Sequence, residues 1–358
     1  MSEIKADFKP DFRPVDRSKL DADQIVRPSV RYWPEVWKRL FKNPLAIVCV
    51  CLIGAMILLA IFAPMLSAFE YDATNMAQTS QKPSFEHPFG TDTAGRDMWA
   101  RVWVGARTSL AIGFLGALTP FLIGTVVGAT SGWCGGWVDM VIMRICDIML
   151  CIPSMIYMIL ILMVMGGSVK SMVVAMAISG WMGSARGFRA RILQFKNREF
   201  TLAARAQGAS AGRIIVRHIL PNILGNIAVG LSSSVPGAIF MEAGLSFIGL
   251  GVTPPHTSLG QLSTDGINYF LLSSKFHLFL FPAIVISVMI FAFFMFGNCL
   301  RDALDPRLRD EEYNARVMRR MARAMKRAAR GDKGLTMETA AAAQSGLAAP
   351  RKEDFRNE

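Results

Sequence analysis

Uninterrupted apolar segments limit what this chain can fold into more than any other feature of its sequence. The first runs from Pro44 to Leu66 without a charged residue. About 20 such residues form a helix that crosses a hydrocarbon core of ~30 Å. Of the 358 residues, 52% are hydrophobic and only 18% are charged, which is too apolar for a soluble domain of this length. We therefore expect an integral membrane protein.

Five more apolar segments follow the first. They cover approximately residues 108–130, 153–165, 171–182, 223–250 and 278–300. The second and third of these are interrupted or bounded by proline and glycine. Lipid offers the backbone no hydrogen bonds, so such spans must be helices. The predicted fold class is an all-α polytopic membrane protein with six transmembrane helices.

Charge predicts the orientation, because basic residues are retained on the cytoplasmic side of a membrane. Lys38, Arg39 and Lys42 precede the first span, and acidic residues dominate the loop after it. Between the fourth and fifth spans, Glu199 is the only acid in a strongly basic stretch. Its cations are Arg186, Arg189, Arg191, Lys196, Arg198, Arg205, Arg213 and Arg217. Six crossings then leave both termini in the cytoplasm.

The predicted domain organisation follows from these spans. It comprises a cytoplasmic tail (1–43), a six-span domain (44–309), and a basic amphipathic and flexible cytoplasmic tail (310–358). Within the six-span domain we expect an outer loop (67–107), a cytoplasmic loop (186–221) and a second outer loop (251–277). Both tails are predicted to contact membrane lipid. The net charge of +12 sits in blocks beside the spans, so we expect no nucleic-acid binding. Six cysteines without a Cys-x-x-Cys pair indicate neither a zinc site nor a disulfide framework.

The cytoplasmic loop has the local chemistry of a helix, a turn and a second helix. Residues 202–207 favour helix, Gly208 suits a left-handed C-cap, Ser210 can cap the next helix, and Pro221 is expected to end it. The first helix presents Ala203, Ala204 and Ala206, whose small side chains let another backbone approach closely. A docking surface and an ordinary amphipathic surface loop both fit this composition.

The same loop resembles the signature loop of the membrane subunits of ABC importers. The matching residues are the adjacent alanines Ala203 and Ala204, then Gly208, and then the pair Leu220 and Pro221. Nine residues (209–217) and two further positions (218 and 219) separate Gly208 from this pair. Two positions depart from the family pattern: Leu202 replaces the usual acid and His218 replaces an aliphatic residue. Glu199, one turn earlier, is a candidate to supply the missing carboxylate.

Further segments resemble the dipeptide, oligopeptide and nickel branch of that family. They are 87–110, 242–251 and 301–307, and the whole resemblance covers roughly residues 35–309. It implies a type I ABC importer permease in a bacterial cytoplasmic membrane, with a coupling helix in the 199–221 loop. The implied partners are a second permease subunit, two cytoplasmic ATPase subunits and an extracytoplasmic binding protein. Peptide and nickel members are alike at this level.

The chain lacks a Gly-x-x-x-x-Gly-Lys-Ser/Thr phosphate loop. We therefore expect it to be a transporter subunit and not an enzyme, with no cofactor of its own and with ATP and Mg²⁺ bound by the partner ATPases. A secondary transporter is the main rival hypothesis, but it predicts several intramembrane carboxylates and an inverted repeat. A membrane enzyme is weaker still, because the four histidines are scattered over both faces.

Polar residues within the spans leave alternatives open. Glu242 fits either a pathway residue or an interhelical hydrogen-bond partner, and Ser233 lies on the same span. Asp139, Arg144 and Asp147 share one helical face, and they either line a path or belong to an interfacial segment whose charges pair with one another. In the outer loop, His87, Asp92 and Asp97 are predicted to serve as caps and turn formers rather than metal ligands.

Overall fold

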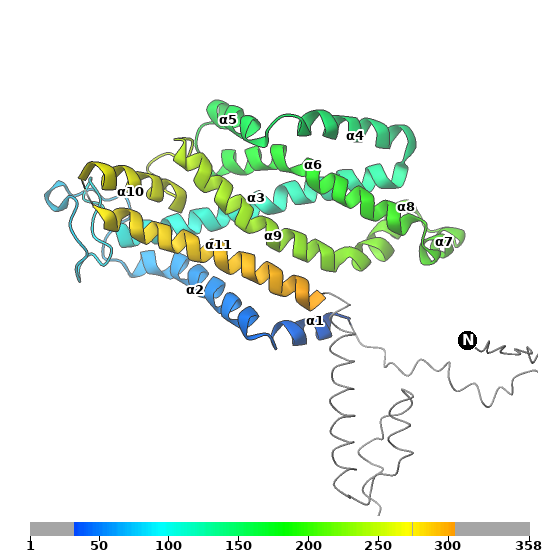
Figure 1. Cartoon of the computed structure of the whole chain (residues 1–358), viewed down its shortest axis with the longest axis horizontal. Helices are drawn as coiled ribbons and strands as arrows, with labels where there is room; N and C mark the ends of the chain where they lie inside the picture. Colours follow the sequence, from blue (N-terminus) through cyan, green and yellow to red (C-terminus); the bar gives the residue numbers. More distant parts are fainter. Residues whose placement is uncertain (1–31, 274, 305–358) are drawn as a thin grey trace, which may run out of the picture.

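The computed structural model describes residues 32–273 and 275–304, and this part of the chain folds into a bundle of helices (Figure 1). The helices are α1 (Tyr32–Leu40), α2 (Pro44–Leu66), η3 (Met76–Gln78), α3 (Met98–Cys134), α4 (Gly136–Leu150), α5 (Ser154–Met165), α6 (Val169–Lys196), α7 (Glu199–Ala206), α8 (Ala211–Ile214), η4 (Ile215–Ile219), α9 (Leu220–Phe247), α10 (Leu259–Ser273) and α11 (Phe276–Leu304). Most of both predicted tails, including the basic amphipathic segment, lies outside the described residues.

Four helical segments in the described part of the chain are long and apolar enough to cross a membrane. They are α2, α3, the segment Ala211–Phe247 and α11, and the bent pair α4 and α5 adds a fifth if it counts as one span. Large apolar side chains point out of the bundle, such as Leu58 and Phe62 of α2, which are 56% and 52% exposed. Lipid, rather than water, is the solvent that such a surface requires.

Helices α3 and α6 lie side by side and run in the same direction. Gly116 faces Met176, Gly124 faces Ser184, and Gly132 faces Ile192, so the contacts advance along both helices together. A Cβ atom on Gly124 would lie only 2.7 Å from the carbonyl oxygen of Trp181. The small-residue stripe of α3 therefore packs inside the bundle, where it brings two backbones into contact.

Helices α4 and α5 carry the chain back along α6, and they meet at a bend of 82°. α4 is tied to α6 by Asp139 and Arg189, and α5 packs against it through Met158 and Leu162. The twelve residues of α5 extend only about 18 Å at 1.5 Å per residue. The predicted third span at 153–165 is thus too short to cross by itself, because the helix breaks ahead of Pro153.

Two further expectations from sequence are corrected by the structure. Pro221 does not end a helix: it lies in the first turn of α9, where its missing N–H costs nothing, and the π-helical turn η4 joins α8 to α9. The predicted outer loop 251–277 contains α10, which is capped by Ser258 and buries Leu259 and Leu262. Its glycines and prolines suggested a loop, but tertiary packing determines the helix.

The bundle has two ends that carry different segments of the chain (Figure 1). We call the end that carries residues 67–97 and α10 the loop end, and the opposite end, which carries α7 and α8, the α7 end. At the loop end, Asp97 caps α3 by accepting a hydrogen bond of 2.9 Å from the Ala100 N–H, as predicted. The α7 end therefore carries the predicted coupling loop, and the loop end carries the predicted turns and caps.

Gly128→Ala is expected to destabilise the α3–α6 contact. The added Cβ would lie 2.3 Å from the Ala185 carbonyl oxygen and 2.8 Å from the Phe188 Cβ, and overpacking of this kind costs about 1–3 kcal/mol. Gly54→Ala in α2 is the matched control, because no atom lies within 4 Å of its added Cβ. Thermal unfolding in detergent should show a lower midpoint for Gly128→Ala alone; equal midpoints would contradict the close packing.

Candidate functional site

α7 is a short helix held at the end of α6 by local hydrogen bonds. Asn197 ends α6, and the Thr201 hydroxyl donates to the Phe195 carbonyl oxygen at 2.8 Å. Gly208 follows α7 with φ of +79°, and Ser210 accepts from the Arg213 N–H at 3.4 Å. The predicted left-handed turn and the predicted cap are both present.

The two adjacent alanines of the signature face opposite ways. Ala204 is buried and packs with Ile214 and Ile219 in one apolar cluster, to which Leu220 adds a half-buried side chain. Ala203 is exposed, and its neighbour Leu202 is 49% exposed. Ala204 therefore seats α7 on its own chain, whereas Ala203 lies on the free face.

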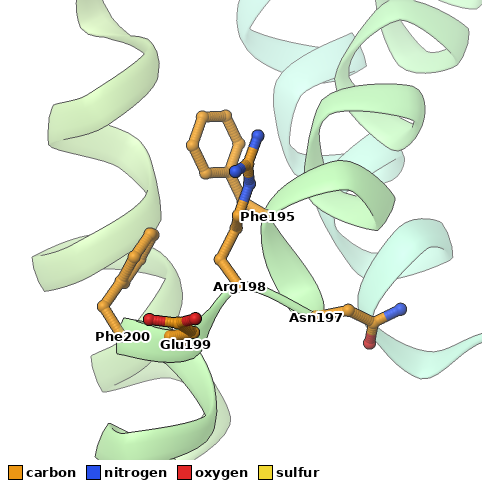
Figure 2. A pocket seen from close by; sticks show the side chains of 5 residues that line it. All are labelled: Phe195, Asn197, Arg198, Glu199 and Phe200. Carbon is orange, nitrogen blue, oxygen red and sulfur yellow. The ribbon is translucent and has the colours of Figure 1, made fainter. Parts of the chain in front are cut away.

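Glu199 opens α7 beside a shallow pocket (Figure 2). The pocket is lined by Phe195, Asn197, Arg198, Glu199 and Phe200. Figure 2 shows the side chains of Arg198 and Phe195 directed to the same side, whereas Asn197 points away. Pro221 is exposed at the start of α9 and is not part of this pocket.

The exposed surface around α7 is basic. Arg198, Arg205, Arg213 and Arg217 are all exposed, and Glu199 is the acid among them. Such a surface favours a partner with complementary acidic groups and accelerates their encounter. Leu202 adds an exposed apolar side chain to this surface, at the position where the family pattern has an acid.

A tryptophan at the end of α3 also contacts α7, and sequence reasoning missed it. The guanidinium carbon of Arg205 lies 4.9 Å from the centroid of the Trp133 ring. Lys196 Nζ lies 5.9 Å from the same centroid and donates to the Trp133 carbonyl oxygen at 2.5 Å. These residues are more than 60 positions apart, so no local pattern signals the contact.

Glu242 is completely buried in α9 and accepts three hydroxyl hydrogen bonds. They come from Ser109 of α3 at 3.0 Å, from Ser246 at 2.9 Å and from Ser258 at 2.6 Å. A buried polar group without partners costs free energy, and these three hydrogen bonds compensate for the burial of the Glu242 carboxyl group. In this conformation, the carboxylate is an interhelical hydrogen-bond acceptor.

The same serines connect Glu242 to the start of α10. Ser109 Oγ also accepts from the Leu259 N–H at 3.0 Å, and Ser258 Oγ accepts from the Gln261 N–H at 3.1 Å. Since each hydroxyl accepts a backbone N–H, its own hydrogen is directed to Glu242. The carboxylate thus lies at the amino terminus of α10, where the helix dipole favours negative charge.

The other predicted polar residues are not brought to Glu242. Ser233 is exposed on α9 and faces Gly297 of α11. Asp147 pairs with Arg186 of α6, and Asp139 accepts from Arg189 Nη2 at 2.6 Å. Both aspartates of α4 therefore pair with arginines of α6.

His87, Asp92 and Asp97 of the loop end serve as caps and turn formers, as predicted. Asp92 accepts from the Ala94 N–H at 2.9 Å and from Arg96 Nε at 2.7 Å. His87 Nδ1 lies 2.9 Å from Asp97 Oδ1. Both carboxylates are thus engaged in holding the loop end together.

Burial raises the pKa of the Asp265 carboxyl on α10 above its ordinary value. The hydrogen bond from Gln261 lowers the same pKa, but its effect is smaller.

Comparison with known proteins identifies the class of protein that has this architecture. The family described as binding-protein-dependent transport system inner membrane component matches residues 124–310. The N-terminal TM domain of oligopeptide transport permease C matches residues 31–83. The chain belongs to the family of binding-protein-dependent inner membrane transport components, and it is therefore a multi-pass permease subunit and not itself an enzyme.

Individual relatives cover most of the chain. The oligopeptide transport system permease protein OppC of Bacillus subtilis is 42% identical over 298 residues, which are 83% of this chain and 97% of that protein. The dipeptide transport system permease protein DppC of the same organism is 40% identical over 81% of this chain and 90% of its own. OppC of Escherichia coli is 40% identical over 77% of this chain and 91% of its own.

Glu242→Ala is expected to lower the free energy of unfolding by about 2–5 kcal/mol, because it leaves a cavity and three hydroxyls without their acceptor. Ser246→Ala removes one donor and should cost about 1 kcal/mol. Ser234→Ala is the control, since its exposed hydroxyl donates only within its own helix, to Gly230. Thermal unfolding in detergent measures all three. An unchanged midpoint for Glu242→Ala, together with altered uptake, would instead make Glu242 a pathway residue.

Proposed function

We propose that this chain is a permease subunit of an ABC importer for dipeptides or oligopeptides in a bacterial cytoplasmic membrane. The observation that carries this proposal is the 40–42% identity to peptide permeases over nearly the whole length of those proteins. A second permease subunit would complete the translocation pathway. The substrate would come from an extracytoplasmic binding protein at the loop end.

Six crossings are predicted from the sequence, and the parallel packing of α3 and α6 supports that number. Two parallel spans need a return between them, which α4 and α5 supply as one broken crossing. α6 has 28 residues and extends about 42 Å, long enough to cross. Its first half contains the apolar segment 171–182 that was predicted as a span, whereas its second half carries Arg186, Arg189, Arg191 and Lys196.

The α7 end is proposed to face the cytoplasm. The cations that end α6 and surround α7 are concentrated there, and basic residues are retained on that side. Six crossings then place both termini in the cytoplasm as well. The loop end is outside, where exposed Glu70, Asp72 and Glu86 give it an acidic character.

α7 is proposed to dock on one of two cytoplasmic ATPase subunits, which bind ATP and Mg²⁺ while this chain binds no cofactor. Ala203 and Leu202 form the approach surface, and Ala204 keeps the helix close to the bundle. Glu199 offers a carboxylate at the start of the helix, where the family acid is absent. Closure of the ATPases on ATP would displace α7, and the spans would rearrange around the substrate.

Gly208→Val is expected to weaken that docking. Gly208 has a φ of +79°, where a side chain strains the backbone by about 1–2 kcal/mol. If the turn distorts to relieve this strain, the ATPase subunit should bind about five- to thirtyfold more weakly. No atom lies within 4 Å of the added Cβ, so membrane insertion should be unaffected. The measurement is recovery of ATPase subunits, and their ATP hydrolysis, with the tagged chain in detergent.

Gly212→Val is the matched control for this experiment. Gly212 also has open space around its Cβ but lacks the positive φ, so it should recover ATPase subunits as well as wild type does. Equal recovery with Gly208→Val would remove the docking role of this loop. A wild-type chain that purifies alone and transports substrate without ATP would replace the importer by a secondary transporter.

A further inference from the structure

The contact between Trp133 and Arg205 joins α7 to the inner end of α3. Trp133 is the penultimate residue of α3, and two cations approach its ring, Arg205 from α7 and Lys196 from the end of α6. Both lie within the roughly 6 Å at which an aromatic face attracts a cation. One indole ring is therefore shared by three helices.

The α3 side of this contact is rigid. A Cβ on Gly132 would lie 2.9 Å from the Arg189 carbonyl oxygen, so α3 and α6 touch at this level. Ser131 donates to Asp139 of α4, which is also bound to Arg189. Residues next to Trp133 are thus fixed to α4 and α6, and a displacement of the indole must move these helices or break its contacts.

The α7 side is seated by small groups. Thr201 and Ala204 are the buried residues of α7 and both are small, while the ring of Phe200 lies 6.2 Å from that of Phe195 on α6. Arg205 follows Ala204 and extends a long charged side chain over the α3 end. Its cation–π contact is specific in direction, whereas the packing of Ala204 is not.

We propose that Trp133 is a positioning residue that transmits displacement of α7 to α3, through Arg205, and so determines how much transport accompanies each ATP hydrolysed. This inference rests on the proposed function, because it needs an ATPase that moves α7. Lys196 holds the Trp133 carbonyl group at the same time, so the indole stays aligned with α6. The indole acts on transport only through these neighbours.

The test uses the complete transporter with its binding protein, reconstituted in vesicles, and measures peptide uptake and ATP hydrolysis together. Trp133→Leu should lower uptake per ATP hydrolysed by about fivefold or more, the lower end of the usual coupling between sites. ATPase subunits should remain bound. Trp133→Phe keeps an aromatic face and should retain most of the ratio.

Trp137→Leu is the matched control, because Trp137 lies on α4 and is 73% exposed; its ratio should equal that of wild type. Arg205→Gln removes the other partner of the same contact, at an exposed position, and should also lower the uptake per ATP hydrolysed. Since both residues form one contact, the double variant Trp133→Leu/Arg205→Gln should be no worse than Trp133→Leu.

Two results would overturn the link. One is a parallel fall of uptake and hydrolysis with a lowered melting temperature, which indicates a structural role alone. The other is an unchanged ratio in Trp133→Leu while the wild-type complex hydrolyses ATP and transports. A wild-type chain that binds no ATPase subunit would instead overturn the proposed function, and the link with it.

Discussion

The parallel contact between α3 and α6 is the constraint on which the rest of the structure depends. Glycines at Gly124, Gly128 and Gly132 let the two backbones touch, and in lipid such close packing replaces the hydrophobic effect as the force between helices. Two consecutive apolar helices usually pair antiparallel across a short turn. Here the parallel arrangement forces the chain to return along α6 through α4 and α5, and it places α7 beside the end of α3.

Function follows from the separation of the two ends. At the loop end, the carboxyl group of Glu242 fixes the start of α10 to α3 and α9, so this end of the bundle is held by polar contacts that are costly to break singly. At the α7 end, a short basic helix rests on small side chains and on Trp133. A rigid junction beneath an exposed helix suits a subunit that receives mechanical work from a partner.

Features that depend on a residue and its near neighbours in the chain could be predicted from the sequence. The first span, the left-handed Gly208, and the caps at Asp97 and Ser210 follow from composition and neighbouring residues, and the structure has all of them. Family resemblance placed the candidate coupling helix at α7.

Features that depend on distant contacts were not predictable in the same way. α10 is helical because Ser258 and Leu259 meet Glu242 and Ser109, which are far away in sequence. Pro221 was predicted to end a helix, yet it is compatible with the first turn of α9 because η4 leads into it. The opposite directions of Ala203 and Ala204, and the Trp133–Arg205 contact, required knowledge of where α7 lies.

The most direct test of the central claim, that α7 is a cytoplasmic docking helix for an ATPase, is chemical cross-linking. All six cysteines are first replaced by serine, since Cys51, Cys134 and Cys151 are exposed, and one cysteine is then introduced at exposed Ala203 or, as the control, at exposed Ser84 of the loop end. With a maleimide–benzophenone reagent, whose maleimide reacts with the introduced thiol and whose benzophenone inserts on illumination into a C–H bond of a neighbouring chain, Ala203→Cys should join this chain to an ATPase subunit of the assembled transporter and Ser84→Cys should not. A cross-link to the ATPase from Ser84→Cys, or none from Ala203→Cys in an active complex, would contradict the account.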